Sequence, residues 1–88
     1  MTIHYRSQSP QILADFLSYH ETIKAHSQRT VDEYYLDLRN FFRYIKQLRD
    51  PSLQGLPFDQ IDIMDVDLAL IKTITLSDIY GYMTYLSR

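Results

Sequence analysis

One long helical pattern runs through the middle of this 88-residue chain and limits what the chain can fold into. Ser27 is suited to cap a helix that continues to residue 48 or 49, just before Asp50-Pro51. Apolar and aromatic residues recur along it every three or four positions, and at about 100° per residue they form one broad stripe centred on Leu38. The stripe comprises Val31, Tyr34, Tyr35, Leu38, Phe41, Phe42, Ile45 and Leu48. A helix of this length with one apolar face predicts a helical domain that packs against it.

A shorter helical pattern precedes this helix. Ser9 is expected to cap it, with Pro10 at the first helical position, and the helix is expected to end between Lys24 and His26. Its predicted apolar face carries Leu13, Phe16, Leu17 and Ile23, with His20 on or near it. After the long helix, the prolines and the glycine of residues 50–60 predict a loop.

Two further helices are predicted after the loop. A short one spans about residues 66–71, and Thr75 is then expected to cap a last helix from Leu76 toward Arg88, with Asp78 completing a variant of the capping box. The last helix is expected to bury Ile79, Met83 and Leu86. Its pattern is still running at residue 88, so more chain is expected beyond it. The sequence thus predicts an all-α fold, a small orthogonal bundle of three main helices plus one short helix.

The composition narrows the possible functional classes. There is no cysteine, which removes a disulfide framework or a thiolate metal site and fits a reducing, cytoplasmic location. The N-terminus lacks the apolar segment of a signal peptide, and no apolar run approaches the roughly 18 residues of a membrane span. His4, His20 and His26 lack metal-ligand spacing, and no nucleophile has a plausible base. We therefore expect no catalytic residue, no metal site, no cofactor and no membrane partner for this chain.

Charge is distributed unevenly along the chain. The net charge is −2, but residues 1–49 hold seven Lys and Arg against five Asp and Glu, whereas residues 50–88 hold two against six. Within the basic half, Arg39, Arg43 and Lys46 share one side of the long helix. Most basic stripes of this size are simply the solvated face of an amphipathic helix. Phosphate binding is the alternative, and it is supported by how the helix opens.

The opening of the long helix combines the groups that bind phosphate oxygens. Residues 27–30, Ser-Gln-Arg-Thr, offer hydroxyls, a guanidinium and the backbone N–H groups of a helix N-terminus. A second hypothesis is a helical protein–protein interaction module without nucleic-acid binding, which would use surface tyrosines on different elements. The candidate tyrosines are Tyr44, Tyr80 and Tyr85. A salt-independent interaction would favour this second hypothesis.

A family resemblance favours the first hypothesis. The pattern Ser27-x-x-Thr30-x-x-x-Tyr34-x-x-Asp37-Leu38-x-x-Phe41-Phe42-x-x-Ile45 resembles the N-terminal core-binding domain of the tyrosine recombinases, the phage integrase and Xer-like group. Residues 74–79 also match the I-T-x-x-D-I opening of that domain's last helix. The resemblance covers about residues 8–88. It implies a SAM-like core-binding domain at residues 9–88, a flexible arm at residues 1–8, and a catalytic domain that is absent from this chain.

The resemblance also implies a function. Such a domain clamps duplex DNA at the recombination site, with its second and fourth helices facing the major groove, for DNA integration or recombination. The chain itself is then no enzyme, because strand cleavage and rejoining belong to the absent C-terminal domain. The implied partners are double-stranded DNA, that catalytic domain and other recombinase protomers in a tetrameric synapse. The implied DNA contacts are Ser27, Gln28, Arg29, Thr30, Arg39, Arg43, Thr75, Ser77, Tyr80 and Thr84.

Overall fold

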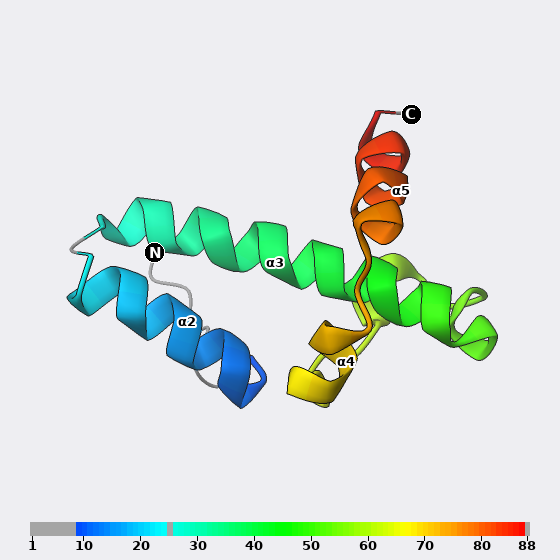
Figure 1. The fold of residues 1–88 in the computed structure, drawn as a ribbon, viewed down its shortest axis with the longest axis horizontal. Coiled ribbons are helices and arrows are strands. Elements are labelled where there is room, and N and C mark those ends of the chain that lie inside the picture. The colour runs from blue at the N-terminus through cyan, green and yellow to red at the C-terminus, as the bar shows by residue number, and fades with distance from the viewer. Residues whose placement is uncertain (1–8, 25, 88) are drawn as a thin grey trace.

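The computed structural model describes residues 9–24 and 26–87, which fold into an arrangement of helices (Figure 1). The α-helices among them are α2 (Gln11–Thr22), α3 (Gln28–Arg49), α4 (Leu68–Lys72) and α5 (Leu76–Leu86). Two 3-10 turns, η1 (Pro51–Leu53) and η2 (Phe58–Gln60), lie between α3 and α4. These residues contain no strand. The predicted all-α class, with three main helices and one short helix, is confirmed. The expected N-terminal arm, residues 1–8, lies outside the described residues.

Helix α3 forms as its sequence predicts. The Ser27 hydroxyl caps it by accepting a hydrogen bond from the Thr30 amide at 3.2 Å, and the helix ends at Arg49, before Asp50 and a proline. The stripe faces the core: Val31, Tyr35, Phe42 and Ile45 are buried, and Tyr34, Leu38 and Phe41 are partly buried. The prediction was wrong for Leu48, which is 46% exposed because the last turn of α3 borders an open groove.

Helix α2 packs antiparallel to the first half of α3 (Figure 1). Leu13 and Leu17 are buried against α3, as predicted. Phe16 and Ile23, which were predicted on the same apolar face, are instead 42% and 68% exposed. Phe16 lies at the edge of the contact between the helices, and Ile23 follows the end of α2.

The predicted ends of α2 were also wrong. Pro10 is the N-cap residue, and the helix begins at Gln11. Ser9 lies one residue before the cap and is buried, at 4% exposure, and its hydroxyl bonds to none of the described residues. The helix ends at Thr22, earlier than expected, because the amides of residues 23 and 24 both bond back to the Tyr19 carbonyl and close the last turn.

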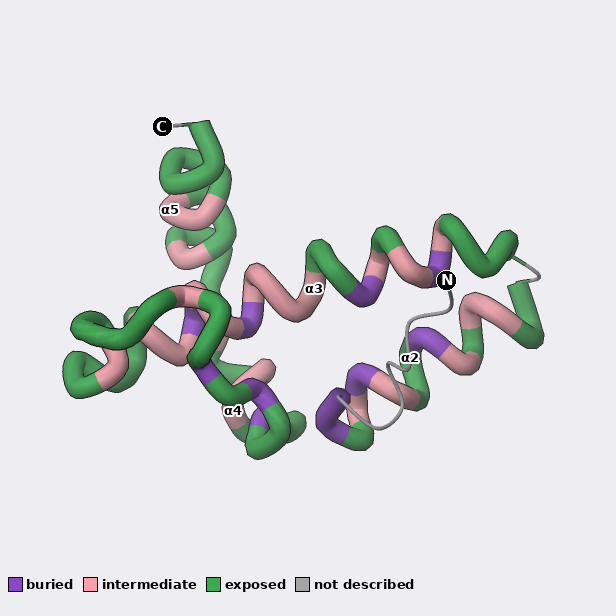
Figure 2. Tube along the Cα trace, turned by 180° about the vertical axis from the view of Figure 1, so that it is seen from behind, coloured by how far each residue is buried: buried purple, intermediate pink, exposed green. Residues whose placement is uncertain are grey.

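The segment after α3 contributes to the core, although the sequence predicted only a loop and a short helix there. Ile61, Ile63 and Val66 are buried, and the last two pack with residues of α2 and α3 (Figure 2). Helix α4 begins at Leu68 and not at residue 66, because the Asp67 carboxylate caps it by accepting the Leu70 amide at 2.9 Å. The core therefore lies between α2, α3 and residues 61–71.

Helix α5 starts as predicted but presents the opposite face to the core. Thr75 and Asp78 form a reciprocal capping box. Ile79, Met83 and Leu86 were wrongly predicted to be buried, since they are 41%, 57% and 62% exposed. The helix rises steeply from the C-terminal half of α3, and none of its residues is buried (Figures 1 and 2). Aromatic residues hold it there, as the ring of Tyr82 lies 5.1 Å from those of Phe41 and Tyr44.

Candidate nucleic-acid interface

The predicted phosphate-binding residues 27–30 lie together at the exposed N-terminus of α3. Arg29 is 90% exposed at its side chain and forms an ion pair with Glu33 at 3.3 Å. Gln28 donates a hydrogen bond to the Asp32 carboxylate at 2.7 Å. An exposed pair of this spacing contributes only about 0.3–0.5 kcal/mol, so a phosphate can displace these carboxylates at low cost. The helix dipole, with no acidic residue in the first turn, favours an anion at the same place.

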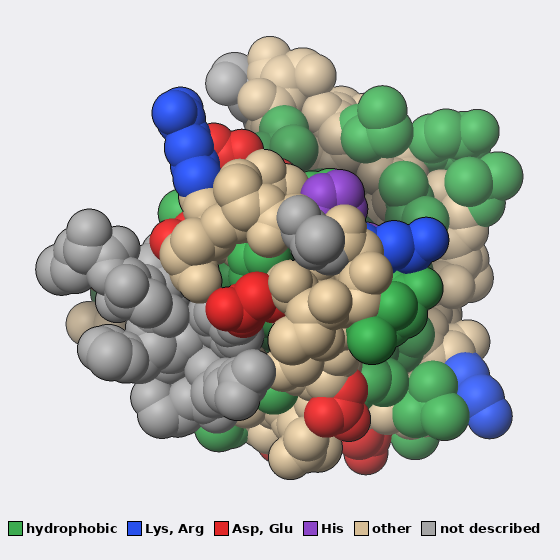
Figure 3. Space-filling model, turned by 90° about the vertical axis from the view of Figure 1, so that its left-hand side faces the viewer, with side chains coloured by type: hydrophobic (Ala, Val, Ile, Leu, Met, Phe, Trp, Pro, Cys, Tyr) green, Lys and Arg blue, Asp and Glu red, His purple; other side chains and the backbone are tan. Residues whose placement is uncertain are grey.

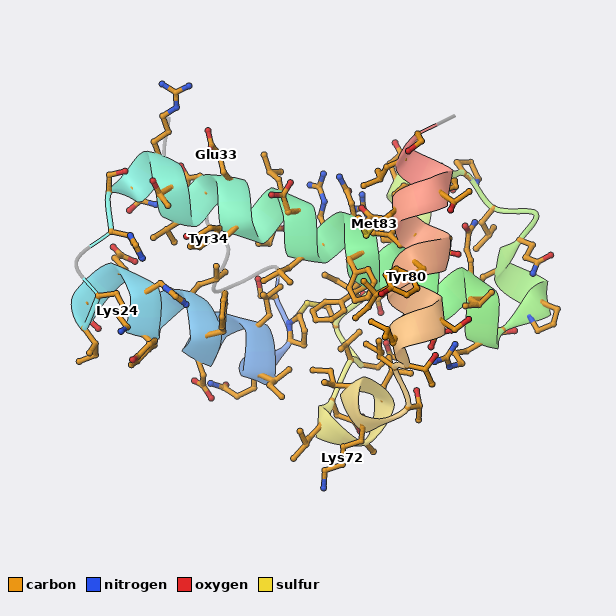
Figure 4. All side chains as sticks on the ribbon, turned by 45° about the horizontal axis from the view of Figure 1, so that its top comes forward. Lys24, Glu33, Tyr34, Lys72, Tyr80 and Met83 are labelled. Carbon is orange, nitrogen blue, oxygen red and sulfur yellow. The ribbon has the colours of Figure 1, made fainter. Side chains whose placement is uncertain are left out.

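Stacked rings fix the turn that leads into this cluster. The imidazoles of His20 and His26 stack with their centroids 5.3 Å apart, and the Tyr34 ring lies edge-on to both. The His26 amide also donates to the His20 carbonyl at 3.0 Å. Figure 4 shows Tyr34 on the side of α3 that faces α2. The sequence placed His20 on or near the apolar face of the first helix but did not predict its stacking with His26. Within residues 9–24 and 26–87, no three His, Asp or Glu side chains are grouped to hold a metal ion; His4 lies outside these residues.

The three residues of the predicted basic stripe of α3 do not share one role: Arg43 and Lys46 contact the loop after α3, and Arg39 does not. Arg43 is partly buried and donates to the backbone carbonyls of Asp59 at 3.1 Å and Ile61 at 3.4 Å. Burial, followed by repulsion from Arg39, lowers the pKa of Arg43. Lys46 is only 16% exposed at its side chain and forms an ion pair with Asp65. Arg43 and Lys46 therefore fasten residues 59–65 to α3, a role the sequence did not reveal because the partners lie in the loop.

Arg39 is different. Its guanidinium lies 5.7 Å from the centre of the Tyr35 ring, and its closest polar contact is Asn40 at 3.5 Å, which is long for a hydrogen bond. Arg39 forms no ion pair in the described part of the chain. Arg39 is partly buried, and its Nε is enclosed without a hydrogen-bond partner among the described residues, so an external anion can reach only the outer part of the guanidinium.

The predicted contacts on α5 are exposed but uncharged. Thr75, Ser77, Tyr80 and Thr84 are all exposed, and Tyr80, labelled in Figure 4, is 59% exposed. The Thr75 hydroxyl caps the helix, and the Thr84 hydroxyl donates to the Tyr80 carbonyl. Asp78 is the one charged residue of α5, and it faces Arg49. This helix can supply hydrogen bonds and ring contacts to a partner, but no cation.

The predicted DNA contacts that remain exposed form three separate groups and not one patch. The groups are residues 27–30, Arg39, and the exposed residues of α5. At a rise of about 1.5 Å per residue, Thr30 is separated along α3 from Arg39 by ~14 Å and from Tyr44, which contacts α5, by ~21 Å. Seen from the α2–α3 end, basic side chains are dispersed and acidic ones lie among them (Figure 3). Any attraction to a polyanion is therefore modest and depends on how the three groups are spaced.

The tyrosines proposed for a protein interface are arranged differently from the prediction. Tyr44 is partly buried, and its ring lies 5.4 Å from that of Tyr85, so these two residues adjoin one another, and Tyr80 lies apart. Tyr44 and Tyr85 border a groove of about 380 Å³ that Gln47, Leu48 and Gln54 also line. Burial, and then the nearby Asp37, raises the pKa of Tyr82 beside them.

Comparisons with known proteins identify the class of protein to which this helical module is related. The chain is 44% identical over 79 residues to the tyrosine recombinase XerC of Caldanaerobacter subterraneus subsp. tengcongensis. The match covers 90% of this chain and 22% of the relative, so the chain spans about a fifth of the relative's length. This homology to a tyrosine recombinase confirms the resemblance that the sequence motifs indicated. No protein-family model matches the chain. No solved structure matches it either. No described helix is long and apolar enough to cross a membrane.

Proposed function

We propose that this chain is the core-binding domain of a site-specific tyrosine recombinase or integrase, and that it clamps duplex DNA at the recombination site. The observation that carries the proposal is the 44% identity to XerC over 90% of the chain. Strand cleavage and rejoining would come from a catalytic domain of the same cytoplasmic protein. Other protomers would complete a tetrameric synapse. The module itself would contribute binding and register to DNA integration or recombination.

The geometry supports phosphate contacts at two places along α3. Arg29 is exposed and Arg39 forms no ion pair in the described part of the chain, and the two positions are about 80° apart around the helix. Their separation of about 15 Å along the axis is close to the ~12 Å width of the major groove, so they suit phosphates on its two edges. The exposed hydroxyls of Ser77, Tyr80 and Thr84 would then contact the duplex from α5. Gln28 and the hydroxyls of residues 27 and 30 would add hydrogen bonds at the helix N-terminus.

The charge balance sets the expected strength of binding. With two or three phosphates contacted, the logarithm of the association constant should fall with the logarithm of salt concentration at a slope of about −2 to −3. The net charge of −2 and the carboxylates beside Arg29 oppose tight binding. We expect the module alone to bind generic duplex DNA weakly and at low salt.

Fluorescence anisotropy with a labelled duplex tests the proposal. The double variant Arg29→Ala/Arg39→Ala should bind about tenfold more weakly at low salt, and its salt slope should be shallower by ~2. Lys72→Ala is the matched control, because Lys72 is an exposed cation at the end of α4 that points away from the proposed surface (Figure 4). A wild-type chain that fails to bind at low salt, or a double variant that binds equally well, would contradict the proposal.

One observation favours the second candidate, a helical protein–protein interaction module. Beside its exposed hydroxyls, α5 also exposes an uncharged aliphatic face, on which Leu76, Met83 and Leu86 are each more than half exposed. An apolar surface of this kind is typical of a protein contact. Binding through it would be nearly independent of salt, whereas DNA binding through the arginines would not.

A further inference from the structure

A polar cluster joins the end of α3 to the start of α5, and the sequence did not single it out. We call it the Arg49 node, and it consists of Arg49, Thr73, Thr75 and Asp78. The Arg49 guanidinium donates to the Asp78 carboxylate at 2.7 Å and to the Thr73 carbonyl at 3.0 Å. A further contact of 3.3 Å reaches the Thr73 hydroxyl. One side chain of α3 therefore holds both the α4–α5 connection and the first turn of α5.

Asp78 serves two elements at once. The same carboxylate oxygen that accepts from Arg49 also accepts the Thr75 amide at 2.9 Å, and so completes the capping box of α5. The bond from Arg49, and next the bond from the Thr75 amide, lower the pKa of Asp78. The side chains of Arg49 and Asp78 are only 30% and 16% exposed, so their contact is partly shielded from solvent. One carboxylate therefore contributes both to the cap of α5 and to the attachment of α5 to α3.

The rest of α5 is held by few contacts. None of its residues is buried, and it meets α3 mainly through the rings of Tyr82 and Tyr85 against Tyr44 and Phe41. Gly81 allows this approach, because a Cβ there would lie 2.9 Å from the Tyr44 hydroxyl. Ring contacts of this kind tolerate sliding, whereas a guanidinium bonded to two fixed acceptors defines a direction. The node is therefore the strongly directional contact between α5 and α3 in the described part of the chain.

We propose that Arg49 and Asp78 are positioning residues for DNA binding: they hold α5 at the angle that brings Ser77, Tyr80 and Thr84 against the duplex while α3 anchors the phosphates. This inference rests on the proposed function. Neither residue needs to contact DNA in this role. Loss of the node leaves the α3 contacts in place and misdirects the α5 contacts.

Electrostatics and positioning predict opposite outcomes for Asp78→Asn. The substitution removes a negative charge, which by itself would strengthen binding to a polyanion. Positioning predicts weaker binding, by about threefold or more, because a neutral amide oxygen in place of the shared carboxylate oxygen accepts a weaker bond from Arg49. Asparagine can still accept the Thr75 amide, so the capping box and the helix should persist. The sign of the change in affinity therefore separates the two explanations.

Asp62→Asn is the matched control. Asp62 also accepts a backbone amide, that of Met64 at 3.0 Å, and it forms no ion pair in the described part of the chain. We expect Asp62→Asn to leave duplex affinity unchanged or slightly higher, and Asp78→Asn to lower it. Arg49→Lys, which keeps the charge on α3, should bind more tightly than Arg49→Ala.

A distance measurement tests the positioning without DNA. The chain has no cysteine, so spin labels on Glu33→Cys and Met83→Cys report only the α3–α5 distance. Both positions are exposed and point into solvent (Figure 4). The distance distribution should be broader or shifted when Asp78→Asn is added, and unchanged when Asp62→Asn is added.

The outcomes separate the inference from the proposed function. If the wild-type chain binds DNA, and Asp78→Asn binds equally well or better, the positioning role is refuted and the proposed function stands. An unchanged spin-label distance in the Asp78→Asn variant also refutes it. A wild-type chain that does not bind DNA at low salt refutes the proposed function and the positioning role together. Weaker binding with an altered distance supports both.

Discussion

Two neighbouring arginines of α3 should respond to the same substitution in opposite ways. Arg43 fastens residues 59–61 to α3, whereas Arg39 has no comparable partner in the described residues. We expect Arg43→Ala to destabilise the fold, and Arg39→Ala to leave its stability nearly unchanged while weakening DNA binding. A double substitution would mix the two effects, so the single variants are compared.

The contacts of Arg43 set the size of the effect. A hydrogen bond from a charged donor contributes about 1.5–3 kcal/mol when it is well shielded. Arg43 makes two, but one is long at 3.4 Å and the side chain is only partly buried, so we expect a combined loss of about 1–2 kcal/mol. Alanine is at least as good a helix former as arginine, so the loss cannot come from helix propensity. In a domain of this size it corresponds to a fall in Tm of roughly 5–15 °C.

Two assays check this reasoning. Thermal unfolding followed by circular dichroism gives the Tm of each variant, and hydrogen–deuterium exchange locates the change. In Arg43→Ala, exchange should accelerate at residues 59–66, where the Val66 amide is bonded to the Ile63 carbonyl. Arg29→Ala is the control, since its side chain is 90% exposed. An Arg43→Ala variant with the Tm and the exchange pattern of the wild type would refute the role assigned to Arg43.

Three further predictions concern the core, the exposed side of α5 and pH. Ile45→Ala should cost about 2–5 kcal/mol, because Ile45 is 0% exposed; retention of the wild-type Tm on thermal melting would contradict its burial. Leu86→Ser should change stability by no more than ~0.5 kcal/mol in chemical denaturation, and a loss of 2 kcal/mol or more would mean that this side chain is covered. Arg49 lowers the pKa of Asp78, and Ser52 lowers the pKa of Asp50. Each carboxylate therefore stabilises the folded state above the unfolded-state pKa of about 3.9, and this stabilisation is lost as pH falls through the lower folded pKa. The Tm should therefore drop below about pH 4, and less steeply in Asp78→Asn; parallel pH profiles would contradict this origin.

Two helix caps that depend on neighbours in sequence were predictable, although the predicted cap of α2 at Ser9 was wrong. The caps at Ser27 and at Thr75 with Asp78 are satisfied within four residues, so the residue types specify them wherever the helix lies. The stripe of α3 was predictable for a related reason, since a regular helix fixes which side chains share a face. The family resemblance rested on the same segment, and the homology to XerC confirms it. The DNA contacts inferred from it remain predictions.

Features that depend on partners far away in the chain were not predictable. Arg43 and Lys46 were expected on a basic stripe, but their partners lie 16 to 19 residues further on, in a loop with no regular pattern. The sequence did not indicate a role for Arg49, because Thr73 and Asp78 meet it only after the chain has turned back. No periodicity in a single segment reports such pairings.

Helix α5 shows most clearly what the sequence specifies and what contacts between elements decide. Its sequence specifies the start, the helical conformation and two apolar faces, one aliphatic with Ile79 and Met83 and one aromatic with Tyr82 and Tyr85. Both faces satisfy the helical period, so the sequence alone does not say which one packs. The choice came from α3, which presents Phe41 and Tyr44 to the aromatic face and Arg49 to Asp78. Local hydrogen bonding and helical periodicity thus determine the elements of this protein. Their mutual orientation, and with it the surface available to a partner, is decided by contacts between elements because the contacting residues are brought together only in the tertiary structure.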